Sequence, residues 1–371
     1  MGNLTATSSD MDTYKSLEIY HFSGTGNCMS AAEWVGKKAS EIQINVNIIP
    51  IDRKQKPLSP SDERTLTGFC FPAHGFSLPW YMMKFIARFP RANKGRKDIF
   101  LMNTRAGMKL YKLFTPGLSG VALLLPMLIL AIKGYRIKGL LPLDMPSNWI
   151  SIHPGIRAKV VNSITDRCER VVGKFADKIL AGKTSIHPIF WILLPLDILV
   201  SPISLGYQII GRFFLAKTFF ASAKCNNCRI CVDKCPVGAI KIVNDRPYWQ
   251  FRCESCMRCM NICPQKTINT AHLLAVGIIW GGLLLPFSCS ISNYLIITYP
   301  SVYTMMPGLI DLTIATLISL PFFWGVYGIY HQLIRVKVAN QLFTYTSLTF
   351  YWRRYIARGV KPSSFKIPKS K

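Results

Sequence analysis

The stretch CNNCRICVDKCP, residues 225–236, places four cysteines within twelve residues, and CESCMRCMNICP, residues 253–264, repeats the same spacing. Both runs read C-x2-C-x2-C-x3-C-P. Packing gives no reason to crowd thiols in this way, whereas thiolates are the usual ligands of zinc and of iron–sulfur clusters. Zinc sites generally pair short C-x2-C ends across a long spacer, so four cysteines in one run favour iron–sulfur clusters.

A reducing compartment is expected for these thiols, which argues against disulfides. Residues 1–16, read as a flexible N-terminus, contain no apolar core of a secretory signal. Ala6 stands where an N-myristoylation motif requires Ser or Thr. Clustered cysteines in such a compartment indicate metal binding more often than disulfides. The cysteines at 70, 168 and 289 stand singly and are expected to be buried core thiols.

The two runs resemble those of the bacterial two-cluster ferredoxins, over residues 223–270. The resemblance implies a small α+β domain with two [4Fe–4S] clusters, in which the fourth cysteine of each run closes the other cluster. One cluster would be held by Cys225, Cys228, Cys231 and Cys263, and the second by Cys253, Cys256, Cys259 and Cys235. A hairpin is expected around Asn244-Asp245. Lys and Arg exceed Asp and Glu in this segment, which predicts raised cluster potentials.

The front half of the chain begins with LEIYHF, residues 17–22, an apolar run of strand length. SGTGNC (23–28) and a stretch with helical spacing (29–39) follow it. Strand, glycine-rich turn and helix form the layout of a phosphate-binding loop, where helix N-terminal amides meet an anion. The loop is neither a Walker A motif nor G-x-G-x-x-G, and its uncharged polar side chains suit the monophosphate of FMN.

This loop resembles the flavodoxin phosphate loop, T/S-x-T/S-G-x-T/S, with a cysteine in the last hydroxyl position. The resemblance implies that FMN phosphate is bound by Ser23, Gly24, Thr25, Gly26, Asn27 and Cys28.

Further strands are expected at 42–51, 66–71, 98–103 and 135–143, and helices at 79–89, 107–133 and 156–182. This alternation predicts a doubly wound parallel sheet, a flavodoxin-like α/β domain over residues 17–184. Ligands of such sheets bind beyond the carboxyl ends of the strands. The loops at 72–79 and 103–109 therefore contribute His74, Gly75, Phe76, Thr104, Arg105 and Gly107 as candidates for the flavin site. Residues 145–149, MPSNW, are left outside this set.

A flavodoxin-like domain followed by a two-cluster ferredoxin domain resembles the EFR1-type flavodoxin–ferredoxin proteins of bacteria, over residues 17–270. Two segments depart from that pattern. Residues 113–132 are more apolar than an exposed amphipathic helix requires. The connector 185–222 contains an apolar run at 186–210 with three prolines, which is either interfacial or re-entrant in a membrane, or a buried link between domains.

Residues 271–334 contain no Lys or Arg and a single acid, Asp311. The runs 271–298 and 312–334 each exceed the roughly 20 residues that cross a bilayer. They predict a transmembrane helical hairpin over 271–335, with a buried pair of helices in a soluble fold as the alternative. Basic flanks stay cytoplasmic, so the redox domains and both termini are expected on the cytoplasmic side of the cytoplasmic membrane. The basic, aromatic tail 336–371 is expected at the lipid headgroups.

Lys and Arg outnumber Asp and Glu by 45 to 18, a net charge of +27. Such an excess attracts anionic lipid, an acidic protein or nucleic acid, and the position of the tail beside a membrane span disfavours nucleic acid. The sequence predicts a membrane-anchored iron–sulfur flavoprotein that relays electrons through two [4Fe–4S] clusters and FMN. Its expected partners are an acidic redox protein, anionic lipid, and a quinone or membrane reductase.

Two other functions stay open at this point. One is a redox sensor or scaffold that has clusters only and a vestigial flavin site. The other is a flavin-dependent reductase of an unidentified substrate. No acid–base pair or nucleophile constellation supports a defined reaction, so no catalytic residue is assigned.

Overall fold

The computed structural model describes residues 14–53, 55–58, 64–92, 97–277 and 307–365, with short pieces at 293–294, 296–298, 300 and 304. The chain forms two compact units. The first contains Met1–Ala216, Arg229–Cys263 and Trp352–Lys371, and the second contains Lys217–Cys228 and Pro264–Tyr351. The first unit therefore combines the front half of the chain with most of the cysteine-rich segment.

A mainly parallel sheet lies at the centre of the first unit, with strand order β2-β1-β3-β4-β6-β7. Its strands are β1 (Ser16–His21), β2 (Asn45–Pro50), β3 (Thr65–Pro72), β4 (Asp98–Leu110), β6 (Arg136–Pro146) and β7 (Ser185–Ile186), and β5 (Leu113–Thr115) pairs antiparallel with β4. The first five strands follow the flavodoxin-like order 2-1-3-4-5 of doubly wound sheets. This order confirms the predicted α/β fold.

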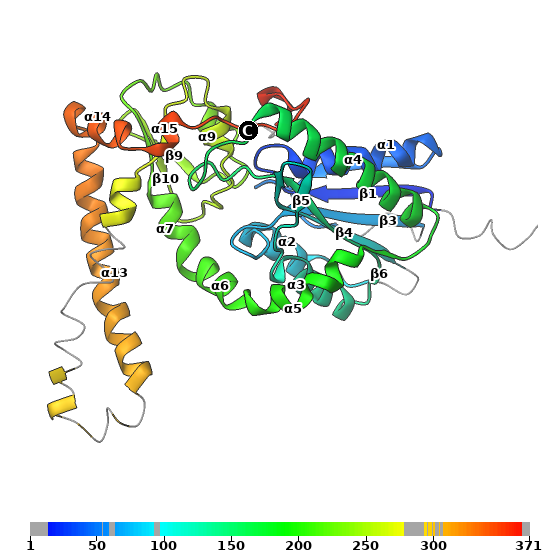
Figure 1. The fold of residues 1–371 in the computed structure, drawn as a ribbon, viewed down its shortest axis with the longest axis horizontal. Coiled ribbons are helices and arrows are strands. Elements are labelled where there is room, and N and C mark those ends of the chain that lie inside the picture. Colours follow the sequence, from blue (N-terminus) through cyan, green and yellow to red (C-terminus); the bar gives the residue numbers. More distant parts are fainter. Residues whose placement is uncertain are drawn as a thin grey trace, which may run out of the picture. The chain divides into compact units, whose positions relative to one another are not determined.

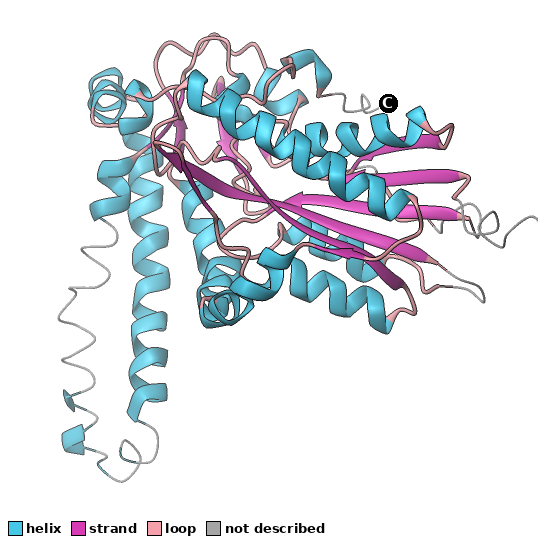
Figure 2. Cartoon of the chain, turned by 45° about the vertical axis from the view of Figure 1, so that its right-hand side comes forward, coloured by secondary structure: helices cyan, strands magenta, loops and turns pink. Residues whose placement is uncertain are grey.

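Helices cover both faces of this sheet. Figure 1 shows α1 (Asn27–Glu41) and α4 (Ala158–Leu180) on one face, and α2 (Trp80–Arg88) and α3 (Val121–Ile132) on the other. Figure 2 shows the same two layers after rotation. Apolar residues recur along α4 every three or four positions and are buried, as an amphipathic helix requires.

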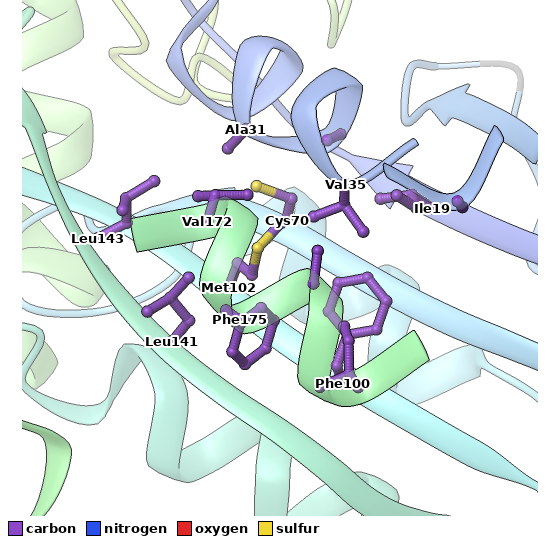
Figure 3. Packing of buried hydrophobic residues seen from close by; sticks show 14 of the residues in the cluster. Ile19, Ala31, Val35, Cys70, Phe100, Met102, Leu141, Leu143, Val172 and Phe175 are labelled. Atoms are coloured by element: carbon purple, nitrogen blue, oxygen red, sulfur yellow. The ribbon is translucent and has the colours of Figure 1, made fainter. Parts of the chain in front are cut away.

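The core on the α1 and α4 side brings together side chains from every central strand (Figure 3). Phe100 of β4 packs edge-on against Phe175 of α4, with ring centroids 6.0 Å apart. Cys70 and Cys168 are buried single thiols, as predicted, and Cys289 lies outside the described residues. Full burial of each large apolar side chain contributes about 1.5–3 kcal/mol, and these contacts fix the helices on the sheet.

The predicted helix at 107–133 is wrong over its first half. β4 continues to Leu110, and Gly107 pairs with Pro146 of β6 before the chain returns in β5. Gly120, at φ 54°, then directs the chain into α3. Cross-strand pairing and two glycines near the start of the apolar run therefore override its helical composition.

The connector consists of α5 (Pro188–Leu199), α6 (Ser201–Gly206), a π-helical turn (Tyr207–Gly211) and α7 (Arg212–Lys217). Large apolar side chains of α5 and α6 are exposed, among them Ile192 at 69% and Leu199 at 73%. The alternative of a buried link is therefore wrong for this face of the connector.

The cysteine-rich part of the first unit contains α8 (Ile230–Asp233), β9 (Ile240–Val243), β10 (Arg246–Trp249) and α9 (Arg258–Ile262). β9 and β10 form an antiparallel hairpin whose two turn residues, Asn244 and Asp245, both have positive φ. Two such residues are typical of the tightest hairpin turns, so the predicted hairpin is confirmed. A short 3-10 turn, Pro362–Ser364, lies near the end of the described chain.

The second unit contains β8 (Phe219–Ala221), which pairs antiparallel with β11 (Ile268–Thr270). Its helices include α13 (Pro307–Leu333), α14 (Lys337–Tyr345) and α15 (Leu348–Tyr351). Asn340 of α14 donates to the Ala221 carbonyl at 3.2 Å, and Ser347 donates to the Thr270 carbonyl at 2.7 Å. These two bonds join the helices to the small sheet.

The predicted membrane crossing at 271–298 lies mostly outside the described residues. The second, 312–334, coincides with α13, many of whose side chains also lie outside them. Within the described part of the chain, no single helix combines the length and hydropathy of a membrane span. α5 and the segment Ser201–Lys217 together have the length and hydropathy of a membrane span, but they form a pair of helices bent by 67°.

Candidate functional site

A cavity of about 490 Å³ lies beyond the carboxyl ends of β1, β3, β4 and β6, within the size range of small-molecule sites. β1 and β3 flank the point where the strand order reverses, which is where doubly wound sheets bind ligands. Nine of the predicted residues line it: Ser23, Gly24, Thr25, Asn27, Cys28, Gly75, Phe76, Thr104 and Arg105. His74, Gly26 and Gly107 do not line it, and their predicted part in the site rests on the sequence alone.

The loop before α1 leaves room for an anion. Gly26 adopts φ 108°, and its amide donates to the Ser23 hydroxyl at 3.0 Å. α1 has no side-chain cap and no acidic residue in its first turn. Thr25 accepts a bond of 3.0 Å from the Asn148 amide. Because both hydroxyls accept in these bonds, each keeps its own proton to donate to a phosphate.

The side chain of Asn27 forms hydrogen bonds between this loop and distant parts of the chain. Its amide group donates to the Pro146 carbonyl at 2.8 Å, and its oxygen accepts from the Tyr355 hydroxyl at 2.6 Å. The Ala357 amide donates to the Thr25 carbonyl at 2.9 Å. Tyr355 and Ala357 of the tail therefore contact the predicted phosphate loop, a contact across more than 300 positions for which the sequence gives no signal.

Arg358 of the same tail also contacts the α/β domain. It lies 2.5 Å from an Asp166 oxygen and 3.3 Å from a Glu169 oxygen, both on α4. This arginine is therefore paired with two carboxylates of the α/β domain.

Arg105 is a fixed charge in the cavity wall. Its side chain is 1% exposed and its Nε lies 2.7 Å from Asp144 Oδ1. The same oxygen accepts from the Gly117 amide at 2.9 Å. The structure thus excludes a solvated surface arginine, because the carboxylate and the buried position hold the guanidinium in place.

Trp149 belongs to the segment that the sequence left out of the site, and it lines the cavity together with residues 146–148. Its indole Nε1 is buried and has no hydrogen-bond partner among the described residues. Its ring centroid lies 5.7 Å from that of His74 and 5.6 Å from that of Tyr207. Burial lowers the pKa of His74 to about 4, so this imidazole is neutral at pH 7.

The predicted ligands divide between the two units. Cys253, Cys256, Cys259 and Cys235, one complete predicted set, lie in the first. Burial raises the pKa of the Cys256 thiol to about 11, so this thiol is protonated at pH 7 without metal and must release its proton when a cluster binds. Of the other set, Cys225 and Cys228 lie in the second unit. In the part of the chain that the structure describes, no three His, Cys, Asp or Glu side chains converge to hold a single ion.

Comparison with known families matches residues 224–268 to a model described as a 4Fe-4S dicluster domain. Comparison with curated proteins finds no match. The matched residues span both cysteine runs. The chain therefore combines an iron–sulfur domain of the 4Fe-4S type with an α/β domain of flavodoxin-like strand order.

Solved structures similar to this chain include a flavodoxin from the domain Archaea, at 15% identity over 44% of this chain and 98% of that one, with a TM-score of 0.29. Flavodoxin 1 from Bacillus cereus is 14% identical over 44% of this chain and 97% of that one, with a TM-score of 0.31. Rubredoxin oxygen:oxidoreductase from Desulfovibrio gigas is 8% identical, with a TM-score of 0.27. This chain covers 37% of that protein, and the similarity covers 44% of this chain.

Proposed function

We propose that this chain is an electron relay of the EFR1 flavodoxin–ferredoxin type, which holds FMN in the cavity and two [4Fe–4S] clusters on its cysteine runs. The observation that carries the proposal is the cavity itself. The loop predicted to bind phosphate lines it, at the strand-order switch point of the sheet. The same chain has the two cysteine runs of a dicluster domain.

The residues present fit FMN. An uncapped helix N-terminus and the hydroxyls of Ser23 and Thr25 would hold the phosphate. Phe76 and Trp149 supply aromatic walls for a ring, and the unpartnered Trp149 Nε1 offers it a hydrogen bond. When bound, flavin exchanges one or two electrons, whereas each cluster exchanges one. Both kinds of group on one chain would connect a two-electron donor to one-electron carriers.

Anaerobic purification of the full chain tests this function. We expect about one FMN and about eight iron atoms per chain, with acid-labile sulfide equal to iron. Iron and sulfide without flavin would instead support the cluster-only sensor. Oxidation of NAD(P)H coupled to reduction of a small acceptor would support the reductase. Absence of acid-labile sulfide would overturn the whole proposal.

The relay works at the cytoplasmic membrane, with its redox domains and both termini on the cytoplasmic side. Supporting features are the lack of Lys and Arg over residues 271–334, which favours the hairpin, and the net charge of +27. Anionic lipid and an acidic redox protein are the partners that such a charge attracts, and a quinone or membrane reductase would accept or supply electrons there. Sedimentation of the chain with membranes tests the location, and recovery in the soluble fraction would oppose it.

A further inference from the structure

The phosphate-binding loop directly contacts one of the cysteine runs. Gly24 lines the cavity, and a Cβ atom added at this glycine would overlap the carbonyl oxygen of Cys256. Only glycine permits such a close approach of two backbone segments. Cys256 is a ligand of the second predicted cluster. The loop that faces the cavity on one side therefore touches a cluster-binding segment on the other.

Arg258 joins the same two segments. Its guanidinium donates to the carbonyls of Ser23 at 2.5 Å and Gly24 at 3.1 Å, and to that of Lys234 at 2.9 Å. Arg258 is buried, and Lys234 immediately precedes the cysteine that completes this ligand set. A planar guanidinium with several donors is suited to such a task, which an ammonium group cannot reproduce.

Two further contacts hold this ligand set against the α/β domain. The carboxylate of Glu254 accepts bonds of 2.9 Å from the backbone amides of Trp80 and Tyr81, at the start of α2. The Arg53 amide donates to the Pro236 carbonyl at 2.8 Å. Both halves of the predicted ligand set are thus bonded to loops at the carboxyl end of the sheet.

We infer that the cluster of Cys253, Cys256, Cys259 and Cys235 is the one that exchanges electrons directly with the cofactor in the cavity, and that Arg258 is the positioning residue for this exchange. The inference rests on the proposed function of the cavity as a flavin site. One electron leaves the reduced flavin and the oxidised cluster accepts it, or the reverse. No bond between heavy atoms changes, and any proton that the flavin loses passes to water. Cys228, a predicted ligand of the other cluster, is exposed and open to an external partner.

Two ligand variants of the full chain form a matched test, Cys256→Ala and Cys228→Ala, each of which removes or converts one cluster. Flavin is reduced by light in the anaerobic protein, and reduction of the remaining cluster is followed by rapid-freeze EPR. We expect the wild-type rate of electron transfer in Cys228→Ala. In Cys256→Ala we expect this rate to be lower by about 10²-fold, because the segment that contacts the phosphate loop no longer holds an intact cluster. Bound flavin, read from its absorbance, is expected to stay unchanged in both.

The reverse order of rates, or equal slowing in both variants, would overturn the inference while leaving the proposed function intact. A wild-type protein that binds no flavin or no clusters would instead refute the proposed function, and the inference with it. The two failures are therefore distinguishable.

Arg258 provides a second measurement that does not depend on loss of a cluster. Arg258→Lys is expected to slow the transfer while iron, flavin and the cluster potential stay close to wild type. Arg258→Gln should in addition shift the cluster potential to a more negative value, because a buried cation beside the cluster is lost. Arg252→Gln is the control, since this exposed arginine lies just before the same run and is bonded to Gln250. Unchanged rate and potential in Arg258→Gln would overturn its positioning role.

Discussion

Gly26 adopts φ 108°, which side-chain-bearing residues avoid, and an added Cβ would lie 2.9 Å from both Ala357 and Val360. Gly26→Ala should therefore destabilise the protein by about 1–3 kcal/mol and weaken FMN binding, because the loop must move away from the tail. Gly359→Ala is the matched control. It has φ 79° with open space around it, and it isolates the backbone strain. Urea unfolding and flavin titration give both quantities, and equal losses in the two variants would contradict the steric explanation.

His74 predicts a pH dependence of stability. Burial lowers its pKa from 6.5 to about 4, so the folded state binds fewer protons than the unfolded state between these values. The contribution of neutral His74 to the free energy of unfolding is present above pH 6.5. It is lost as the pH falls towards 4, by up to about 1.4 kcal/mol per pH unit. Buried His21, with a pKa also lowered to about 4, acts in the same direction. His74→Gln should make the stability of the protein less sensitive to acid.

The measurement is urea unfolding of wild type and His74→Gln at several pH values from 4 to 7. Burial raises the pKa of Glu254 to about 7. The contribution of this group to the free energy of unfolding is therefore present at low pH and is lost as the pH rises towards 7. The two groups act in opposite directions, and the difference between variant and wild type isolates the histidine. A constant difference across the range would rule out this titration.

At the scale of elements, one carboxylate links two helices. Asp197 of α5 is buried and accepts bonds from the backbone amides of Ser119 at 2.9 Å and Gly120 at 2.8 Å, just before α3. Asp197→Ala would leave two buried donors unpaired and should lower the free energy of unfolding by about 1–3 kcal/mol. Asp197→Asn, which keeps an acceptor, should lower it less.

Thermal or urea unfolding measures these losses. Asp177→Ala on α4 is the control, because this exposed carboxylate pairs with Lys38 at 3.3 Å and such pairs contribute about 0–1 kcal/mol. A loss for Asp197→Ala no larger than that for Asp177→Ala would show that the buried bonds contribute little.

Local patterns predicted the elements whose own residues determine them. Apolar runs of strand length matched β1 and β3, and the Asn244-Asp245 turn placed the cluster-domain hairpin correctly. The sequence failed where distant segments decide the structure. Pairing with β6 at Gly107 and with β5 at residues 108–110 made this segment a strand. The contact of Tyr355 with the phosphate loop likewise followed no local signal. Trp149 reached the cavity because β6 directs the following loop there, which periodicity cannot show.

At the scale of the whole molecule, cluster number can be counted. Cys228→Ala should lower iron by about half or less, because one cluster is removed or converted while the other keeps its own four thiolates. Cys168→Ala is the matched control, since this buried core thiol lies outside both runs. Iron and acid-labile sulfide assays on anaerobic protein give the result. Unchanged iron in Cys228→Ala would remove this residue from the ligands.

The exposed apolar face of α5 and α6 provides a test of the proposed membrane location. Ile192 is 69% exposed and Leu199 73% exposed. Transfer of each such side chain into lipid contributes about 1.5–3 kcal/mol. The double variant with Ile192→Ser and Leu199→Ser should therefore bind anionic vesicles with an affinity at least about tenfold lower than that of the wild type. Ile42→Ser is the control, because this isoleucine is 53% exposed beside the end of α1.

Co-sedimentation with vesicles of mixed anionic and neutral lipid measures this binding, and a series of salt concentrations separates its two sources. The charge of +27 supplies attraction that salt weakens, whereas burial of apolar side chains persists at high salt. The wild type should therefore stay bound at high salt to a greater extent than the double variant. Equal binding of both proteins at every salt concentration would show that the face of α5 and α6 contributes no transfer free energy to lipid binding, and would contradict this prediction.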